Sequence, residues 1–214
     1  MAIRHYSPFD RFIHGLDQAL RTTLGPASAP SRPNPAAVKP EASLSAAERE
    51  LAGRLMRVNH AGEISAQALY QGQALTARLP TVRDKMEQAA SEENDHLAWT
   101  EERIHELGTH TSLLAPVWYA GSFAIGALAG LAGGKWSLGF VVETERQVIR
   151  HLDSHLARLP EHDAKDRAIL EQMRNDEARH ATTALAAGAA ELPGLLQALM
   201  QMTSKVMTKT AYWL

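Results

Sequence analysis

Two pairs of side chains combine residue types that bind metal ions with a spacing that places them together. Glu93 and His96 form one Glu-x-x-His pair, and Glu177 and His180 form the other. Residues three apart lie about one turn apart on the same face of an α-helix, so the carboxylate and the imidazole can reach one ion. Each pair therefore predicts half of a metal site.

A lone glutamate stands about one helical hairpin before each pair, at Glu63 and at Glu145. The midpoint between each lone glutamate and the glutamate of the following pair falls in or next to the sequence Ala-Arg-Leu-Pro, at residues 77–80 and 157–160. Proline stops a helix, so both segments are predicted turns. Two antiparallel hairpins that turn there bring each lone glutamate level with the pair that follows it.

Four carboxylates and two imidazoles in this order are the ligand set with which ferritin-like four-helix bundles hold two iron or manganese ions. The predicted metal ligands are Glu63, Glu93, His96, Glu145, Glu177 and His180. Carboxylates favour hard cations and one imidazole per ion suits iron, so the predicted cofactor is a pair of iron ions. Such a site keeps coordination positions open and, in its reduced form, reacts with dioxygen.

Two other glutamates compete with this assignment. Glu102 and His105 form a third Glu-x-x-His pair, but it starts nine residues after Glu93, half a turn away, and is predicted to face solvent. Glu143 lies about 200° around the helix from Glu145, so only one of the two can face the site. Spacing and turn positions alone leave that choice open.

Glycine and histidine precede the first ligand in the sequence. Gly62 destabilises a helix by about 1 kcal/mol relative to alanine, which suggests that a neighbouring helix or a ligand approaches closely beside Glu63. His60 is expected to be a surface or capping histidine.

Composition limits the class of protein. The chain has 214 residues, 22 basic and 24 acidic side chains, and no cysteine. A net charge near zero without a basic stripe does not suggest nucleic-acid binding, and the lack of cysteine excludes disulfides, thiolate zinc sites and iron–sulfur clusters. Asp10, Arg11 and Asp17 interrupt any apolar core of a cleavable signal. Abundant alanine and leucine predict an all-α fold. Together with the ligand pattern, this predicts a ferritin-like four-helix bundle with additional amphipathic helices.

The chain divides into three predicted parts: an amphipathic helix at 1–25, a proline-rich extended or mobile linker at 26–42, and the ferritin-like domain at 43–214. The first helix can pack on the bundle or meet a membrane surface or partner. The uncharged segment 111–134 is long enough to span a bilayer, but a span would separate the two hairpins that share the site. It is expected instead to line an apolar pocket, to dip into one leaflet, or to form a buried crossover helix. Residues 192–214 predict an apolar helix that caps the bundle or lies at a membrane interface.

Several of these motifs resemble one known family. The sequences Asn-His-Ala-Gly-Glu at 59–63, Glu-Glu-Asn-Asp-His at 92–96 and Asn-Asp-Glu-Ala-Arg-His at 175–180, with the Gly/Ala-rich stretch before Glu145, are similar to the demethoxyubiquinone hydroxylases of ubiquinone biosynthesis. The resemblance covers roughly residues 45–214, and the proline-linked arm looks like the bacterial form.

The resemblance implies a di-iron monooxygenase that hydroxylates the ring of 2-polyprenyl-3-methyl-6-methoxy-1,4-benzoquinone. It implies the same six ligands, with Glu145 rather than Glu143, because the family places a histidine six residues after this ligand and His151 stands there. His151 is then either a relay of protons or electrons, or a supporting or surface histidine.

The same resemblance implies a set of partners and a location. The partners are the polyprenyl benzoquinone substrate, dioxygen, an electron donor and a membrane surface, but no nucleic acid; a complex of ubiquinone-biosynthesis proteins or a homo-oligomer is a further expectation. The expected location is peripheral, on the cytoplasmic side of the cell membrane. The alternatives are other ferritin-like di-iron functions, namely hydroxylation of a tRNA base and iron storage.

Overall fold

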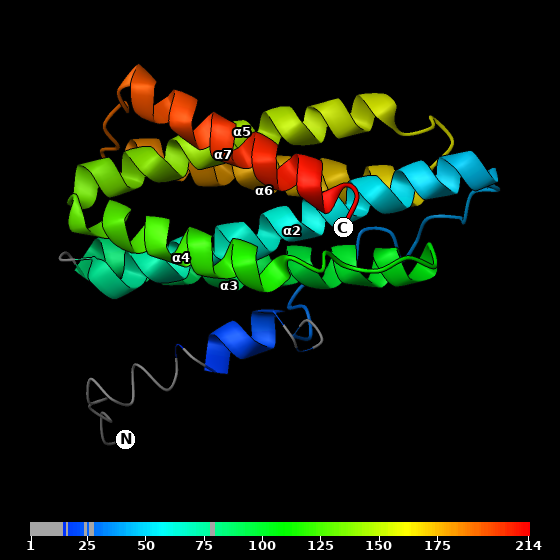
Figure 1. The fold of residues 1–214 in the computed structure, drawn as a ribbon, viewed down its shortest axis with the longest axis horizontal. Coiled ribbons are helices and arrows are strands. Elements are labelled where there is room, and N and C mark those ends of the chain that lie inside the picture. The colour runs from blue at the N-terminus through cyan, green and yellow to red at the C-terminus, as the bar shows by residue number, and fades with distance from the viewer. Residues whose placement is uncertain (1–14, 16, 24, 26–27, 78–79) are drawn as a thin grey trace.

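The computed structural model describes residues 15, 17–23, 25, 28–77 and 80–214. Within these residues the structure is helical and contains no strand (Figure 1). The helices are α2 (Ala46–Thr76), α3 (Pro80–Glu106), α4 (Ala115–Leu131), α5 (Gly134–Arg158), α6 (Ala164–Ala186) and α7 (Gly194–Ala211). Residues 17–23 add a short helical segment in the N-terminal arm.

Four of these helices form the predicted bundle. Helices α2 and α3 make one hairpin and α5 and α6 make the other. α2 ends at Thr76 and α3 begins at Pro80, while α5 ends at Arg158, two residues before Pro160, so both turns lie where the sequence predicts them. Residues 78–79 of the first turn are outside the described residues. The all-α, ferritin-like fold class is thus confirmed.

Local signals set where helices begin and end. Ser45 caps α2 by accepting a hydrogen bond from the backbone N–H of Glu48, whose side chain accepts one in return from the backbone of Ser45. This reciprocal capping box satisfies two donors that the first turn would otherwise leave unpaired. After α3, Gly108 has a φ of 73°, the left-handed conformation that commonly follows a helix and that glycine adopts without strain.

The long connection between the hairpins contains α4, which packs along α2. A Cβ atom at Gly72 of α2 would collide with the carbonyl oxygen of Phe123, and one at Gly126 of α4 would collide with that of Leu69. The glycines therefore let the two backbones approach closely, and α4 serves as a crossover helix. Among the described residues, no helix is both long and apolar enough to cross a membrane.

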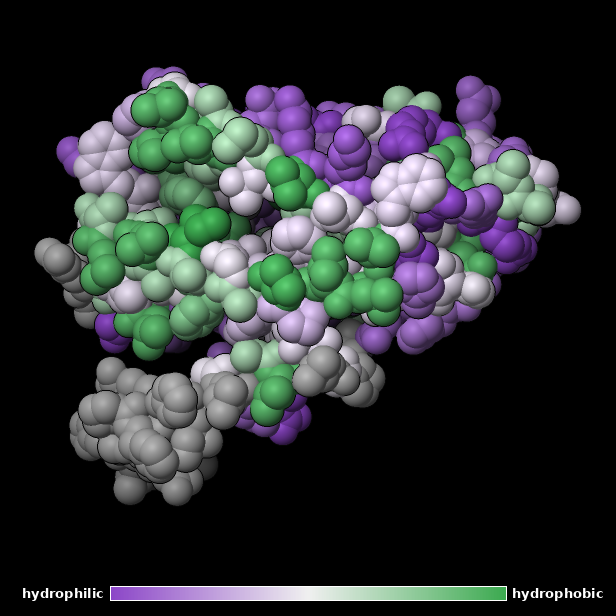
Figure 2. Space-filling view, viewed as in Figure 1, coloured by the Kyte–Doolittle hydropathy of each residue, from purple (hydrophilic) through white to green (hydrophobic). Residues whose placement is uncertain are grey.

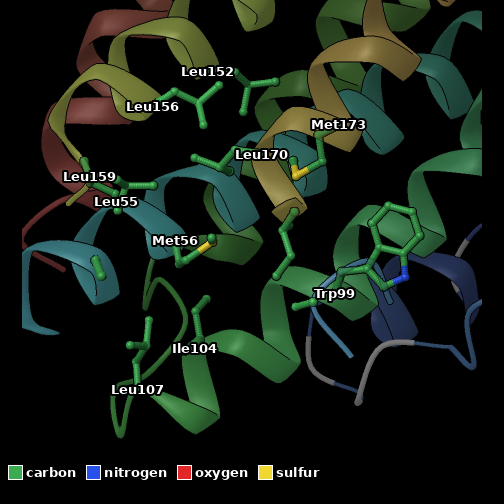
Figure 3. Packing of buried hydrophobic residues seen from close by; sticks show 13 residues of the cluster. Leu55, Met56, Trp99, Ile104, Leu107, Leu152, Leu156, Leu159, Leu170 and Met173 are labelled. Atoms are coloured by element: carbon green, nitrogen blue, oxygen red, sulfur yellow. The ribbon is translucent and has the colours of Figure 1, made fainter. Parts of the chain in front are cut away.

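Apolar clusters lie on both sides of the bundle's middle and join the two hairpins. On one side, residues of all four bundle helices pack together, as Figure 3 shows; they include Leu55, Met56, Trp99, Leu152, Leu170 and Met173. On the other side a second cluster contains Tyr70, Met86, Leu138, Val142 and Ala184. The predicted ligands fall between these two sets on every helix, so packing at both ends fixes the height of each ligand.

The N-terminal arm lies against the α2–α3 hairpin. The Oγ1 of Thr22 donates a hydrogen bond to Gln67 on α2, and Ser31 and Arg32 bind Asp95 on α3. Most of the apolar residues that predict the amphipathic helix at 1–25, Phe9 and Phe12 included, lie outside the described residues. Residues 28–42 form no helix or strand.

Candidate metal centre

The structure brings the six sequence-predicted ligands together in the middle of the bundle. Two groups of four side chains have ligand atoms that all lie within 4.8 Å of one another. Both groups contain Glu93 and Glu177; the first adds Glu63 and His96, and the second adds Glu145 and His180. Two adjacent groups that share two carboxylates would suit a pair of metal ions.

His96 presents one ring nitrogen to the carboxylates of the first group. Its Nδ1 lies 3.0 Å from Glu93 Oε2, 3.2 Å from Glu177 Oε1 and 3.3 Å from Glu63 Oε2. Its other nitrogen, Nε2, lies 3.1 Å from Oδ2 of Asp176. If a metal ion took the place of the Nδ1 proton, donation from Nε2 to Asp176 would leave the lone pair of Nδ1 to bind that ion.

His180 repeats this arrangement in the second group. Its Nδ1 lies 3.1 Å from Glu177 Oε2, 3.6 Å from Glu93 Oε1 and 3.8 Å from Glu145 Oε1, while its Nε2 lies 2.7 Å from Oε2 of Glu92. The two halves of the site are therefore related by an approximate two-fold symmetry, as the repeated motif predicts.

Two outer carboxylates, Glu92 and Asp176, were not among the sequence-predicted site residues. Each immediately precedes the glutamate of one Glu-x-x-His pair, and each binds the histidine of the other pair. A carboxylate that accepts the second N–H of a metal-binding histidine fixes the ring and raises its basicity. The acidic doublets Glu92-Glu93 and Asp176-Glu177 are the sequence signal that identifies them.

Burial of so many carboxylates perturbs their protonation. Desolvation raises the pKa of Glu63 and of Glu145 well above the usual range, and the neighbouring charge of Glu177 adds to the rise at both. Burial alone would raise the pKa of Glu177 as well, but hydrogen bonds from His180 and His96 lower it well below its ordinary value. Burial opposes charging of His180, yet Glu177 and Glu93 raise its pKa to about 9. The cluster thus requires compensating positive charge.

The side chains fit a pair of divalent cations. Oε1 of Glu93 and Oε1 of Glu145 are buried without a hydrogen-bond partner among the described residues. Unpaired buried carboxylate oxygens are unfavourable, and metal coordination satisfies them. Four carboxylates also balance the charge of two divalent ions, and this oxygen-rich set with one imidazole per position is typical of iron or manganese.

The competing glutamates lie apart from the cluster. Glu143 Oε1 instead accepts hydrogen bonds from Gln147 and Arg150. Neither of the two groups of potential metal ligands includes Glu143. Glu102 and His105 are exposed, as predicted. Glu143 and Glu145 therefore point to different sides of α5, as their 200° separation predicts, and Glu145 faces inward.

One expectation about the residues before Glu63 is wrong. His60 is buried rather than on the surface, because it lies in the middle of α2 beneath the arm and the start of α4. A Cβ at Gly62 would enter open space, so no neighbouring helix of the described structure approaches it, and the approach of a ligand stays a prediction. His151 packs against His155, with ring centroids 3.9 Å apart, and His155 in turn lies 2.8 Å from the Oδ1 of Asn59.

A four-helix bundle with four carboxylates and two imidazoles gathered in its core defines a ferritin-like protein with a cluster that could hold metal ions. Comparison with known proteins narrows this class. Residues 50–211 match the family described as "Ubiquinone biosynthesis protein COQ7". The chain therefore belongs to the COQ7 family of ubiquinone biosynthesis proteins.

Relatives of similar length carry one common name, 3-demethoxyubiquinol 3-hydroxylase. The protein of that name from Nitrosococcus oceani is 61% identical over 211 residues, which cover 99% of each chain. The one from Stutzerimonas stutzeri is 59% identical over 98% of this chain and 97% of its own. The one from Pseudomonas aeruginosa is 56% identical over 99% and 98%.

Proposed function

We propose that this chain is a dioxygen-dependent monooxygenase of ubiquinone biosynthesis that hydroxylates the ring of 2-polyprenyl-3-methyl-6-methoxy-1,4-benzoquinone (demethoxyubiquinone). The observation that carries the proposal is the buried pair of ligand groups that share Glu93 and Glu177. The name shared by full-length relatives at 56–61% identity supports the choice of substrate.

Six side chains would hold two iron ions: Glu63, Glu93, His96, Glu145, Glu177 and His180. Iron bound there supplies the ability to activate dioxygen. The protein holds the carboxylates level with one another through the apolar clusters at both ends of the bundle. Asp176 and Glu92 keep Nδ1 of each histidine directed inward. The same packing limits entry of water to the site.

The reaction replaces a ring C–H bond by a C–O bond. One oxygen atom of dioxygen enters the ring and the other leaves as water, which requires an electron donor that supplies two electrons together with two protons. The relatives' name gives the substrate as the quinol, the two-electron-reduced form of the same ring.

An apolar face over α4 and α7 suits a substrate with a polyprenyl tail. Figure 2 shows apolar side chains gathered over these helices. The exposed residues of α4 and α7 include Val117, Leu128, Leu131, Leu195, Leu199, Met202 and Val206. Contiguous apolar surface of this kind marks interaction sites, and a helix that lies in the interface buries such side chains among lipids. We infer peripheral attachment to the cytoplasmic side of the membrane, where the tail stays in lipid.

The proposal is tested with iron-loaded protein, a short-chain demethoxyubiquinone, isotopically heavy dioxygen and a chemical reductant that supplies the two electrons and can also reduce the ring to the quinol. Mass spectrometry is expected to show a hydroxylated ring that carries one heavy oxygen atom. Glu177→Ala should abolish the product, because it removes a carboxylate common to both ligand groups, while circular dichroism should retain the helical signal. Turnover retained by Glu177→Ala would contradict the proposal, as would product oxygen derived from water.

A further inference from the structure

His96 and His180 each bind a carboxylate outside the cluster through Nε2, but these two carboxylates differ in exposure and in the side chains that contact them. Asp176, which binds His96, has a side chain only 2% exposed and receives Arg32 from the N-terminal arm. Glu92, which binds His180, is 29% exposed and receives Arg179, itself 55% exposed. Arg179 also lies 3.1 Å from Oδ1 of Asp176 and so supports both outer carboxylates. The ion pair with Arg32, which is 33% exposed, is the additional support of the half that contains His96.

Arg32 connects the arm to both hairpins at this point. Its Nε donates to Oδ2 of Asp95 on α3 at 2.6 Å, and its Nη1 donates to Oδ2 of Asp176 on α6 at 2.8 Å. That same Asp176 oxygen lies 3.1 Å from His96 Nε2. The guanidinium thus holds the carboxylate that orients His96 and ties it to the neighbouring helix.

The surroundings of Arg32 fix its position. The backbone N–H and the hydroxyl of Ser31 donate to Oδ1 of Asp95. The guanidinium carbon lies 4.9 Å from the centroid of the Trp99 ring, and that ring lies 5.5 Å from the ring of His96. Arginine is suited to stacking on an indole ring and to donating hydrogen bonds to two carboxylates at once, and lysine is not.

We propose that Arg32 is a positioning residue for the metal centre, acting through Asp176 so that the position bound by His96 holds a metal ion more tightly than the position bound by His180. The inference rests on the proposed two-metal site and deepens it. It gives the N-terminal arm, which lies outside the matched family segment 50–211, a role in metal binding.

The physical reason for the difference is the environment of the two outer pairs. The side chain of His96 is fully buried and that of His180 is 9% exposed. Charge-assisted hydrogen bonds are stronger where water is excluded, and the carboxylate of Asp176, 2% exposed, is more fixed than that of Glu92, 29% exposed. Both effects favour a fixed imidazole at His96.

Titration of the metal-free full chain with Co²⁺, followed by the visible absorption of the bound ion, tests the proposal. We expect two ions per chain in two separate phases, and the His96→Ala variant should lose the tighter phase. Arg32→Ala should weaken the tighter phase by about 10- to 100-fold, the usual effect of removing an outer partner of a ligand, and leave the weaker phase unchanged. The Co²⁺ affinity of Arg32→Lys in the tighter phase should lie between those of wild type and Arg32→Ala.

A double-mutant cycle separates positioning from general destabilisation. Adding Arg32→Ala to His96→Ala should leave the remaining Co²⁺ affinity unchanged, because the only route for the effect has been removed. The matched control is Arg174→Ala, which breaks an ion pair between Arg174 on α6 and Asp153 on α5. It should leave both phases as in wild type.

Several outcomes would overturn the inference. Equal weakening of both phases by Arg32→Ala would do so, as would the same loss in the His96→Ala background or unchanged affinities in Arg32→Ala. A wild-type chain that binds no Co²⁺ would instead remove the proposed metal site itself, and the inference with it.

Discussion

At the scale of single residues, the metal centre depends on which atoms face inward on four helices. The repeated Glu-x-x-His pairs and the lone glutamates could be predicted because residues three apart share a helix face whatever the tertiary structure. The contacts of Arg32 could not be predicted, because its two partners lie 63 and 144 residues further along the sequence. No helical or strand period relates such positions.

His60 shows how burial contradicts a prediction from sequence. Polar residues are usually exposed, so a histidine next to an alanine–glycine pair reads as a surface residue. In the fold, the arm and the start of α4 cover this part of α2, and the Nδ1 of His60 has no hydrogen-bond partner among the described residues. Only the path of the arm and of the crossover helix determines this burial.

The burial of His60 predicts a pH dependence of stability. Desolvation, with a smaller contribution from the charge of His105, lowers the pKa of His60 from 6.5 to about 4. Between these values the unfolded chain binds a proton that the folded chain does not, so the free energy of unfolding falls as the pH falls. The contribution of this residue is about 3 kcal/mol, since each pKa unit corresponds to about 1.4 kcal/mol.

Urea denaturation of the metal-free chain from pH 7 to pH 4 measures this effect. His60→Gln should lose less stability over that range than wild type. His110→Gln, which replaces an exposed histidine before α4, is the matched control and should follow wild type. Identical slopes for His60→Gln and wild type would show that His60 takes up its proton freely in the folded chain.

At the scale of elements, glycines determine how closely α4 approaches α2. The sequence of 111–134 left several roles open, because an uncharged Gly/Ala-rich stretch suits lipid, a pocket or a packed helix equally well. The structure places α4 against α2, with backbone contacts at Gly72 and Gly126. Glycine content indicates close approach, but only the fold shows which helix is approached.

Gly126→Ala tests that packing. The added methyl would meet backbone atoms of Leu69, which cannot move independently, so the free energy of unfolding should fall by about 1–3 kcal/mol. Gly121→Ala on the same helix is the control: its Cβ would enter open space, and alanine favours helix by about 1 kcal/mol over glycine. Chemical denaturation should therefore separate the two variants, and equal effects would contradict the close packing of α4 on α2.

At the scale of the whole molecule, the fold combines a buried polar centre with an exposed apolar face over α4 and α7. The bundle could be predicted from the hairpin symmetry, and the helix ends from proline, glycine and the Ser45–Glu48 capping box. The extent of the apolar face could not, because it depends on which sides of α4 and α7 remain uncovered after packing.

Binding to vesicles of phosphatidylethanolamine and phosphatidylglycerol tests this face. Replacing both Leu195 and Leu199 by aspartate should weaken sedimentation with vesicles at least ~10-fold, because each buried leucine contributes about 1.5–3 kcal/mol. Val38→Asp is the control, since Val38 is 86% exposed but lies in the segment before α2. Failure of the wild-type chain to bind vesicles, or equal loss in both variants, would count against membrane attachment.

The central claim is that this bundle holds two metal ions through inward-facing residues, and the iron content of chains reconstituted without oxygen tests it most directly. Glu145→Ala and Glu143→Ala are neighbouring changes of the same size on α5. We predict two irons per wild-type chain and per Glu143→Ala chain, because Glu143 faces Gln147 and Arg150, and clearly less iron in Glu145→Ala. Equal iron in both variants, or none in wild type, would contradict the account.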